Sequence, residues 1–263
     1  MNESVREPAV AGAFYPASRA ALGELVSRLL EGARKPETRA LPKAIVAPHA
    51  GYVYSGPIAA SAFALLEPYA ESIERVVLVG PAHRVRVLGL ASPGADALRT
   101  PLGDVVVDTA ALASLDVVAS PAAHAREHSV EVELPFLQRV APRARVVPLA
   151  VGRAGEDEVA RVLEALWGGA ETVIVVSSDL SHYLPYDEGR AVDERTAARI
   201  VALDAAPLEG EDACGCAGIN GLLRIARAKG MRAELVDLRS SGDTAGKRDE
   251  VVGYGAFGFW EAS

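Results

Sequence analysis

Short apolar runs rich in β-branched residues recur along the chain, and Gly, Pro, Ser or Asp residues bound each of them. Runs of this length and composition are typical of strands that are buried on both faces of a sheet. We therefore predict five buried strands, at residues 44–47, 75–79, 146–151, 172–176 and 233–237.

Segments whose apolar residues recur at helical spacing lie between these runs. They predict helices at 20–30, 58–66, 130–140, 157–166, 187–203 and 219–229. Strands that alternate with helices form right-handed crossovers, and these produce a largely parallel sheet covered on both faces. We expect one α/β domain over residues 1–263, with three α/β/α layers around a mostly parallel sheet. Three further segments rich in Gly and Val predict extra strands, antiparallel at an edge of the sheet, at 85–91, 104–108 and 251–259.

The charge balance narrows the class of partner. The chain has 27 Lys and Arg against 35 Asp and Glu, a formal net charge of −8, which offers no basic face for a phosphate backbone. The first residues carry both charge signs and Pro8, and no run approaches the roughly 18 apolar residues of a membrane span. We expect a cytoplasmic protein that binds neither nucleic acid nor membrane.

The two cysteines, Cys214 and Cys216, are separated by one glycine. Two cysteines are too few for a disulfide framework, and a reducing compartment fits this usage. The pair is not a Cys-x-x-Cys redox motif. Buried thiols and a thiolate at the start of the following helix both remain open, and we favour the structural role.

Polar residues follow the predicted strands at their carboxyl ends, where open α/β sheets bind ligands. His49 follows the first strand, His83 the second, Asp179 and His182 the fourth, and Asp243 the fifth. Three of the five histidines and two aspartates are therefore expected along one edge of the sheet.

This convergence favours a metal site. Neutral imidazole is the commonest metal-ligating side chain, and two imidazoles with one carboxylate leave open positions on Fe(II). The sequence predicts His49, His83 and Asp243 as the ligands. The alternative for Asp243 is turn chemistry, since it ends a Ser-Gly-Asp sequence.

The other two histidines, His124 and His128, are four residues apart at the start of a predicted helix. On a helix they would share a face, which suits a metal pair, but at a helix start we expect His128 to line the pocket or contact an anion and His124 to be structural. Tyr52, Tyr54 and Tyr183 are candidates for the pocket wall, and the alternative for each is packing at the sheet end with the hydroxyl in water.

Two serines, Ser177 and Ser178, also follow a predicted strand. They lack the Gly-x-Ser-x-Gly elbow that exposes a hydrolase nucleophile, so we do not favour that role.

Several blocks of sequence together are specific enough to identify a family resemblance. In chain order they are REPAVAGAFYP (6–16), APHAGYVYSG (47–56), GPAH (80–83), EHSVE (127–131) with LPFL (134–137), SSDLSHY (177–183) and SSGD (240–243). They resemble the Memo family over essentially the whole chain. That family is similar in fold to the class III extradiol ring-cleaving dioxygenases, which hold non-haem Fe(II) with two histidines and a glutamate and use a further histidine as acid/base.

The resemblance implies metal ligation by His49, His83 and Asp243 and an acid/base role for His182. Asp179 would orient the His182 imidazole, with a helix N-cap as its alternative role. The implied cofactor is a divalent metal, Fe(II) first, with Zn(II) or Mn(II) as the other candidates. The implied function is a metal-dependent oxidoreductase of unknown substrate, with a small aromatic or diol-like molecule expected.

The alternative function is a non-catalytic module that keeps the cleft and binds a small molecule or a peptide there. Prokaryotic members of the family are often found beside radical-SAM proteins, so a radical-SAM protein of the same modification pathway is the expected partner.

Overall fold

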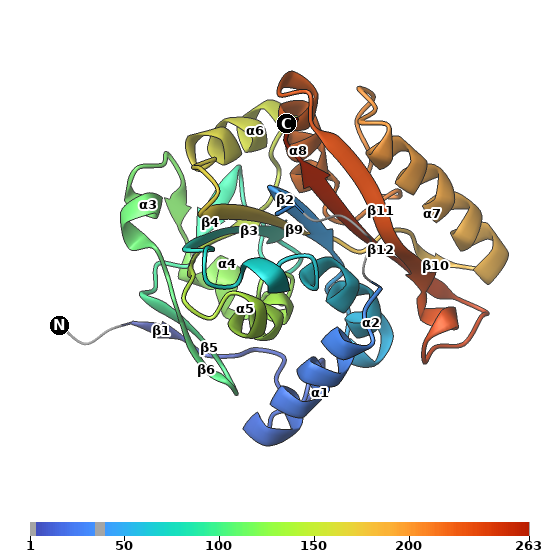
Figure 1. Ribbon diagram of the computed structural model, residues 1–263, viewed down its shortest axis with the longest axis horizontal. Coiled ribbons are helices and arrows are strands. Elements are labelled where there is room, and N and C mark those ends of the chain that lie inside the picture. Colours follow the sequence, from blue (N-terminus) through green and yellow to red (C-terminus); the bar gives the residue numbers. More distant parts are fainter. Residues whose placement is uncertain (1–3, 35–39, 263) are drawn as a thin grey trace.

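A nine-stranded mixed sheet is the main element of the protein (Figure 1). The structure is a computed structural model, and it describes residues 4–34 and 40–262. The strand order is β10-β12-β2-β9-β3-β8-β4-β7, and β11 also pairs with β12. The strands are β2 (Ala44–Ala47), β3 (Arg75–Pro81), β4 (Leu90–Ser92), β7 (Val118–Ala119), β8 (Arg145–Val151), β9 (Thr172–Ser177), β10 (His182–Leu184), β11 (Arg232–Ser240) and β12 (Val251–Trp260).

The four central strands β2, β9, β3 and β8 are parallel, as predicted. The expectation of a mostly parallel sheet holds only in part, because the sheet is mixed and has antiparallel pairs on both flanks. On one side β12 pairs antiparallel with β2, β11 and β10, and on the other β4 pairs antiparallel with β8. No α-helix lies between β11 and β12, and parallel neighbours need such a crossover, so these two strands form an antiparallel pair.

A separate three-stranded sheet includes the first strand of the chain (Figure 1). It takes up the strand predicted at 104–108, whereas the strand predicted at 251–259 lies inside the main sheet instead of at its edge. The three strands are β1 (Val5–Arg6), β5 (Ala97–Thr100) and β6 (Gly103–Val106), with β1 parallel to β5 and β5 antiparallel to β6.

Some helices begin where a side chain caps the first turn or where acidic residues lie in it. At the start of α1, the Ser18 hydroxyl accepts from the backbone N–H of Ala21, and the first turn of α6 carries three acidic residues, which suits the helix dipole. The helices are α1 (Arg19–Glu31), α2 (Tyr52–Phe63), α3 (Thr109–Ala113), α4 (Pro121–Ala125), α5 (Leu134–Val140), α6 (Glu156–Ala165), α7 (Tyr186–Val201) and α8 (Cys216–Ala228), with 3-10 turns η1 (Glu67–Tyr69), η2 (Glu131–Glu133) and η3 (Ser241–Asp243). In the described part of the chain, no helix has both the length and the apolar character needed to cross a membrane.

Alternate residues of the central strands enter two different hydrophobic cores, as the period of two in a strand requires. Ile45 and Ala47 face the core built with α1, α2 and α5, whereas Ala44 and Val46 face the core built with α6, α7 and α8. Figure 1 shows these two helical layers on either side of the sheet. The α/β/α layering is therefore as predicted.

The N-terminal segment is fastened to the segment that carries His124, Glu127 and His128. The Arg6 guanidinium donates to the backbone carbonyls of His124 and Glu127 and pairs with the buried Glu131 carboxylate. Glu131 also accepts from the backbone N–H groups of residues 9 and 10. A buried, fully bonded carboxylate thus holds two segments that are far apart in the sequence.

Candidate metal centre

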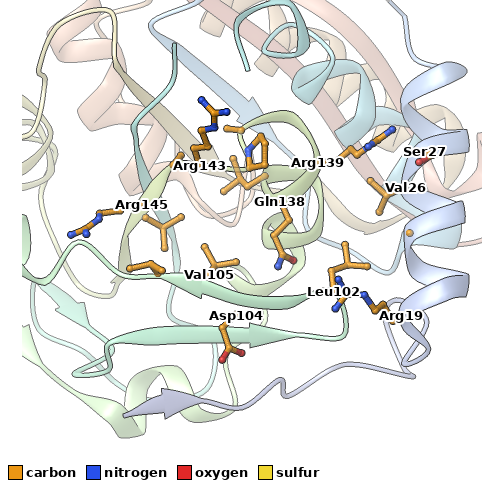
Figure 2. A pocket seen from close by; sticks show the side chains of 17 residues that line it. Arg19, Val26, Ser27, Leu102, Asp104, Val105, Gln138, Arg139, Arg143 and Arg145 are labelled. Carbon is orange, nitrogen blue, oxygen red and sulfur yellow. The ribbon is translucent and has the colours of Figure 1, made fainter. Parts of the chain in front are cut away.

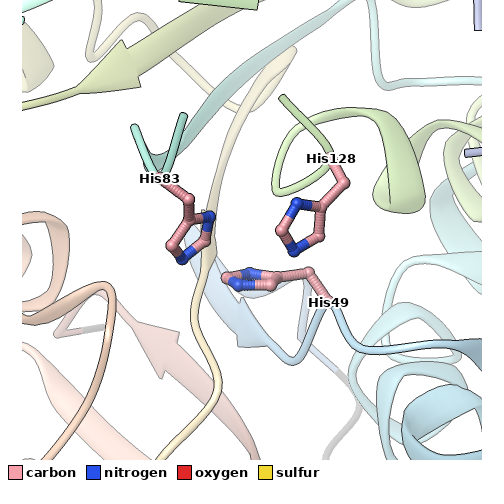
Figure 3. A group of neighbouring side chains, drawn as sticks. All are labelled: His49, His83 and His128. Atoms are coloured by element: carbon pink, nitrogen blue, oxygen red, sulfur yellow. The ribbon is translucent and has the colours of Figure 1, made fainter. Parts of the chain in front are cut away.

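Three histidines converge beyond the carboxyl ends of the central strands (Figure 3). Each of His49, His83 and His128 offers one ring nitrogen, and these atoms all lie within 4.8 Å of one another. The ring centroids are 5.3 Å apart for His49 and His83, 5.5 Å for His49 and His128, and 4.9 Å for His83 and His128. Donor atoms this close together can coordinate one ion.

His49 is buried directly after β2, and Ser177 at the end of the neighbouring β9 fixes its ring. Ser177 Oγ lies 2.7 Å from His49 Nδ1, 2.7 Å from the carbonyl oxygen of Ser129 and 2.8 Å from Glu133 Oε1. The hydroxyl has one hydrogen, which one of the two oxygens receives, so Ser177 Oγ accepts from Nδ1–H of His49. The Nε2 atom of His49 then carries the lone pair that could bind a metal, and Cys214 Sγ lies 3.4 Å from it.

His83 lies after β3, and a carboxylate fixes its ring in the same way. Its Nδ1 lies 2.9 Å from Glu127 Oε1, and its backbone N–H donates to the other oxygen of Glu127. Burial alone would raise the pKa of Glu127, but these hydrogen bonds, with one from the backbone of Ser129, hold that pKa well below its usual range. An ionised Glu127 keeps the proton on Nδ1, which leaves Nε2 of His83 as the free donor atom.

His128 completes the group from the loop before η2. Burial lowers the pKa of its ring to about 4, so the imidazole is neutral near pH 7. Its Nδ1 is buried and has no hydrogen-bond partner among the described residues, although Glu127 Oε1 lies 3.3 Å away. The sequence predicted a pocket-lining or anion-contacting role for His128, and the structure adds that the ring belongs to the cluster with His49 and His83.

A cavity of about 910 Å³ opens in front of the three rings. Asp179, His182 and Tyr183 line it, together with side chains from α7 and from the loop that precedes α8. Burial lowers the pKa of His182. His182, the predicted acid/base residue, thus lines the same cavity as the three imidazoles.

Asp179 contacts a different group from the one that the sequence suggested. Its buried carboxylate accepts from the backbone N–H of His49 at 2.8 Å, and burial raises its pKa to about 7. The side chain therefore supports the backbone turn that presents His49, whereas we expected it to orient the His182 imidazole.

Asp243 does not join the histidines, which corrects the predicted ligand set. Its Oδ2 accepts from the backbone N–H and the hydroxyl of Ser240, and its Oδ1 accepts from the Tyr186 hydroxyl. Strand β12 lies between the two places, because Gly253 pairs with Ser240 on one edge and hydrogen-bonds Ser181 on the other. The turn chemistry considered as the alternative describes this residue, and His128 stands where Asp243 was expected.

The remaining candidates divide between the cavity and the core. Tyr183 is exposed on the cavity wall with a left-handed backbone (φ 58°), Tyr54 is partly exposed on α2, and Tyr52 is buried and donates to the carbonyl of Val132. His124 is buried, with Nε2 2.8 Å from the carbonyl oxygen of Ala91. Tyr52 and His124 thus hold the scaffold together, away from the cavity.

Cys214 lies at the site, although the sequence analysis considered it only as a structural thiol or a helix-start thiolate. Its Sγ lies 3.4 Å from His49 Nε2 and accepts from the backbone N–H of Asp179, and burial raises its pKa to about 12. Cys214 follows no strand, so the search after strand ends missed it. Glu127 and Ser177 were also missed as ring partners, although both belong to motifs that are plain in the sequence.

A second cavity, of about 590 Å³, lies between α1, the β5–β6 hairpin and α5 (Figure 2). Arginines surround it, but Figure 2 shows their side chains spread around its rim. One of them, Arg143, pairs with Glu71. No residue predicted for the functional site lines this cavity, so the histidine cavity is the better candidate.

Comparison with known proteins agrees with the family resemblance. The family described as Memo-like protein matches residues 6–257. A MEMO1 family protein of Archaeoglobus fulgidus is 36% identical, with 97% of this chain and 99% of the relative covered. Relatives of the same description from Methanopyrus kandleri and Aquifex aeolicus are each 37% identical, with 97% and 95% of this chain and 98% and 97% of the relatives covered. The chain therefore belongs to the Memo family.

Proposed function

We propose that this protein binds a divalent metal ion between His49, His83 and His128 and acts as a metal-dependent oxidoreductase. The observation that carries the proposal is the convergence of three ring nitrogens within 4.8 Å. The two rings whose Nδ1 atoms are engaged by Ser177 and Glu127 present Nε2 as the donor, as metal-ligating histidines usually do. Imidazole suits Fe(II) and Zn(II), and the resemblance to the extradiol dioxygenases favours Fe(II) over Zn(II) or Mn(II).

The residues around the cavity fit a reaction on a small diol or aromatic molecule. A bound metal would supply a Lewis acid and a template for the substrate oxygens. His182 is neutral near pH 7 because burial lowers its pKa, so it is suited to take a proton from the substrate. Asp179 keeps the His49 backbone in place.

Cys214 offers a further donor atom close to this group, since its Sγ lies 3.4 Å from His49 Nε2. A nearby cation favours the thiolate and would oppose the effect of burial on the Cys214 pKa. A thiolate is a softer donor than imidazole, so the choice of metal depends on whether Cys214 takes part.

The test is metal content after anaerobic loading with Fe(II), Zn(II) or Mn(II). One equivalent of bound metal is expected, and it is lost in His49→Ala, His83→Ala and His128→Ala but kept in the control Arg86→Ala, an exposed residue outside the cavity. Oxygen uptake with a panel of catechols then tests the oxidoreductase. His182→Ala is expected to keep the metal and lose the uptake.

The alternative function, a binding module that keeps the cleft, predicts metal or ligand binding with no oxygen uptake for any catechol. Failure of all three metals to bind would contradict the proposed metal site itself. Partnership with a radical-SAM protein stays a prediction from the family resemblance.

A further inference from the structure

Two arginines line the histidine cavity without a partner of their own. Arg84 directly follows His83 in the loop after β3, and Arg195 lies on α7. Across residues 4–34 and 40–262, neither guanidinium forms a hydrogen bond or an ion pair. Nearby arginines on α7 are engaged, since Arg190 pairs with Glu194 and Arg199 with Asp204.

Arg84 is close enough to act on the candidate metal ligands. It is the chain neighbour of His83, and it lines the same cavity as His83 and His128. The guanidinium of Arg84 thus places a positive charge on the wall that His83 and His128 also line.

One acidic residue of the cavity, Asp212, already has other partners. The carboxylate of Asp212 is engaged by Arg199 and by the backbone N–H of Glu209. Glu188 and Glu211 are exposed on the wall. An unpaired guanidinium next to a metal site matches the geometry of a carboxylate or phosphate, which it binds through two parallel N–H donors.

We propose that the ligand of this cavity carries a carboxylate or phosphate group, which Arg84 holds next to His128 and which Arg195 contacts from α7. This inference rests on the proposed function for the identity of the cavity. It names the chemical class of the substrate that the metal-dependent reaction would take, and it makes Arg84 and Arg195 the residues that select it.

The experiment measures binding by calorimetry with three probes that share an aromatic ring: benzoate, phenyl phosphate and the neutral benzyl alcohol. Both metal-free and anaerobically Fe(II)-loaded protein are used. We expect the anionic probes to bind more tightly than benzyl alcohol, and Arg84→Ala to weaken them about 10-fold, the value of one charge-assisted contact. Arg195→Ala is expected to have a smaller effect in the same direction. Tighter binding of benzoate or of phenyl phosphate identifies the preferred anion.

The matched control is Arg86→Ala, which removes an exposed arginine two residues from Arg84 that does not line the cavity. Arg86→Ala is expected to leave all three affinities unchanged, and Glu188→Gln to tighten anion binding. The inference is overturned if benzyl alcohol binds as well as the anions, or if Arg84→Ala and Arg86→Ala have equal effects. Because the metal-free protein is tested too, loss of the metal proposal and loss of the anion proposal give different results.

Discussion

Polar residues follow β2, β3 and β11 at their carboxyl ends. Only the residues after β2 and β3 contribute to the candidate metal centre. His49 and His83 face each other across 5.3 Å between ring centroids. Asp243 follows β11 at the same end of the sheet, but β12 separates β11 from β2. A polar residue after a strand thus predicts the end of the sheet at which it lies, whereas the order of the strands decides which residues meet.

The two regions also differ in what their polar atoms have left to offer. Ser177 and Glu127 engage the Nδ1 atoms of His49 and His83 and leave their Nε2 atoms as the donors, and one ring nitrogen of each histidine in the group lies within 4.8 Å of the others. The two oxygens of Asp243 are already occupied by Ser240 and Tyr186. The first region keeps donor atoms that could hold a metal ion, whereas the polar atoms of the second hold a turn at the end of a strand.

The largest expected effect is on metal affinity, and it distinguishes the histidine region from the region around Asp243. His49→Ala or His83→Ala removes one of the three donor atoms and should weaken metal binding by more than about 100-fold, the most that loss of an outer partner usually costs. Asp243→Ala should leave the metal affinity unchanged. Competition with a chromophoric chelator under anaerobic conditions measures both. Weaker binding in Asp243→Ala would mean that the two regions act together.

The next largest effect on metal affinity is expected from the Glu127 carboxylate, which is hydrogen-bonded to His83. Glu127→Gln removes the charge that keeps the proton on Nδ1, and we expect metal affinity to fall about 10- to 100-fold. Asp243→Asn is the matched control, because it neutralises a carboxylate on the other side of β12. Equal affinities for Glu127→Gln and the parent protein would show that Glu127 does not set the His83 tautomer.

A smaller effect on metal affinity is expected from Ser177, which is hydrogen-bonded to His49. Ser177→Ala removes the acceptor for Nδ1–H, and we predict a loss of about 10-fold in metal affinity, the lower end for such a partner. Ser178→Ala also removes a buried hydroxyl, but this one serves the backbone of Asp179 and Gly215. Both variants should lose stability in urea, so only a difference in metal affinity between them supports a role for Ser177 in the site.

The sequence predicted the centre of the fold well because fully buried parallel strands leave continuous apolar runs. Strand β2 has the predicted bounds, and β3, β8, β9 and β11 extend the predicted runs by a few residues. The prediction was weaker where a segment is short or partly exposed, as in β10, which has three residues. Helix α2 begins at Tyr52 instead of residue 58, because the exposed Val53 and Tyr54 in its first turn and Pro57 hide its apolar spacing.

The candidate site was predictable only in part for a related reason. His49, His83 and His182 were found because each follows a strand whose position the apolar pattern marks. His128, expected only on the pocket wall, and Cys214 come from loops before helical segments, and no periodicity shows how closely such loops approach the histidines. The pairing of β12 between β2 and β11 is a long-range feature, so the sequence could not separate Asp243 from the histidines.

The smallest expected effect concerns stability in the region around Asp243. Asp243 and Ser240 form a capping box, so Asp243→Ala should lower the free energy of unfolding at pH 7 by about 1 kcal/mol. Burial would raise the pKa of Asp243, but the hydrogen bonds from Tyr186 and Ser240 outweigh it and lower that pKa below its ordinary value. A lowered pKa in the folded state stabilises the fold above the unfolded pKa, and this contribution disappears as the pH falls through the folded value. Urea unfolding should therefore show the parent and Asp243→Ala converging in acid, while a difference that stays constant with pH would mean that the Asp243 charge plays no part.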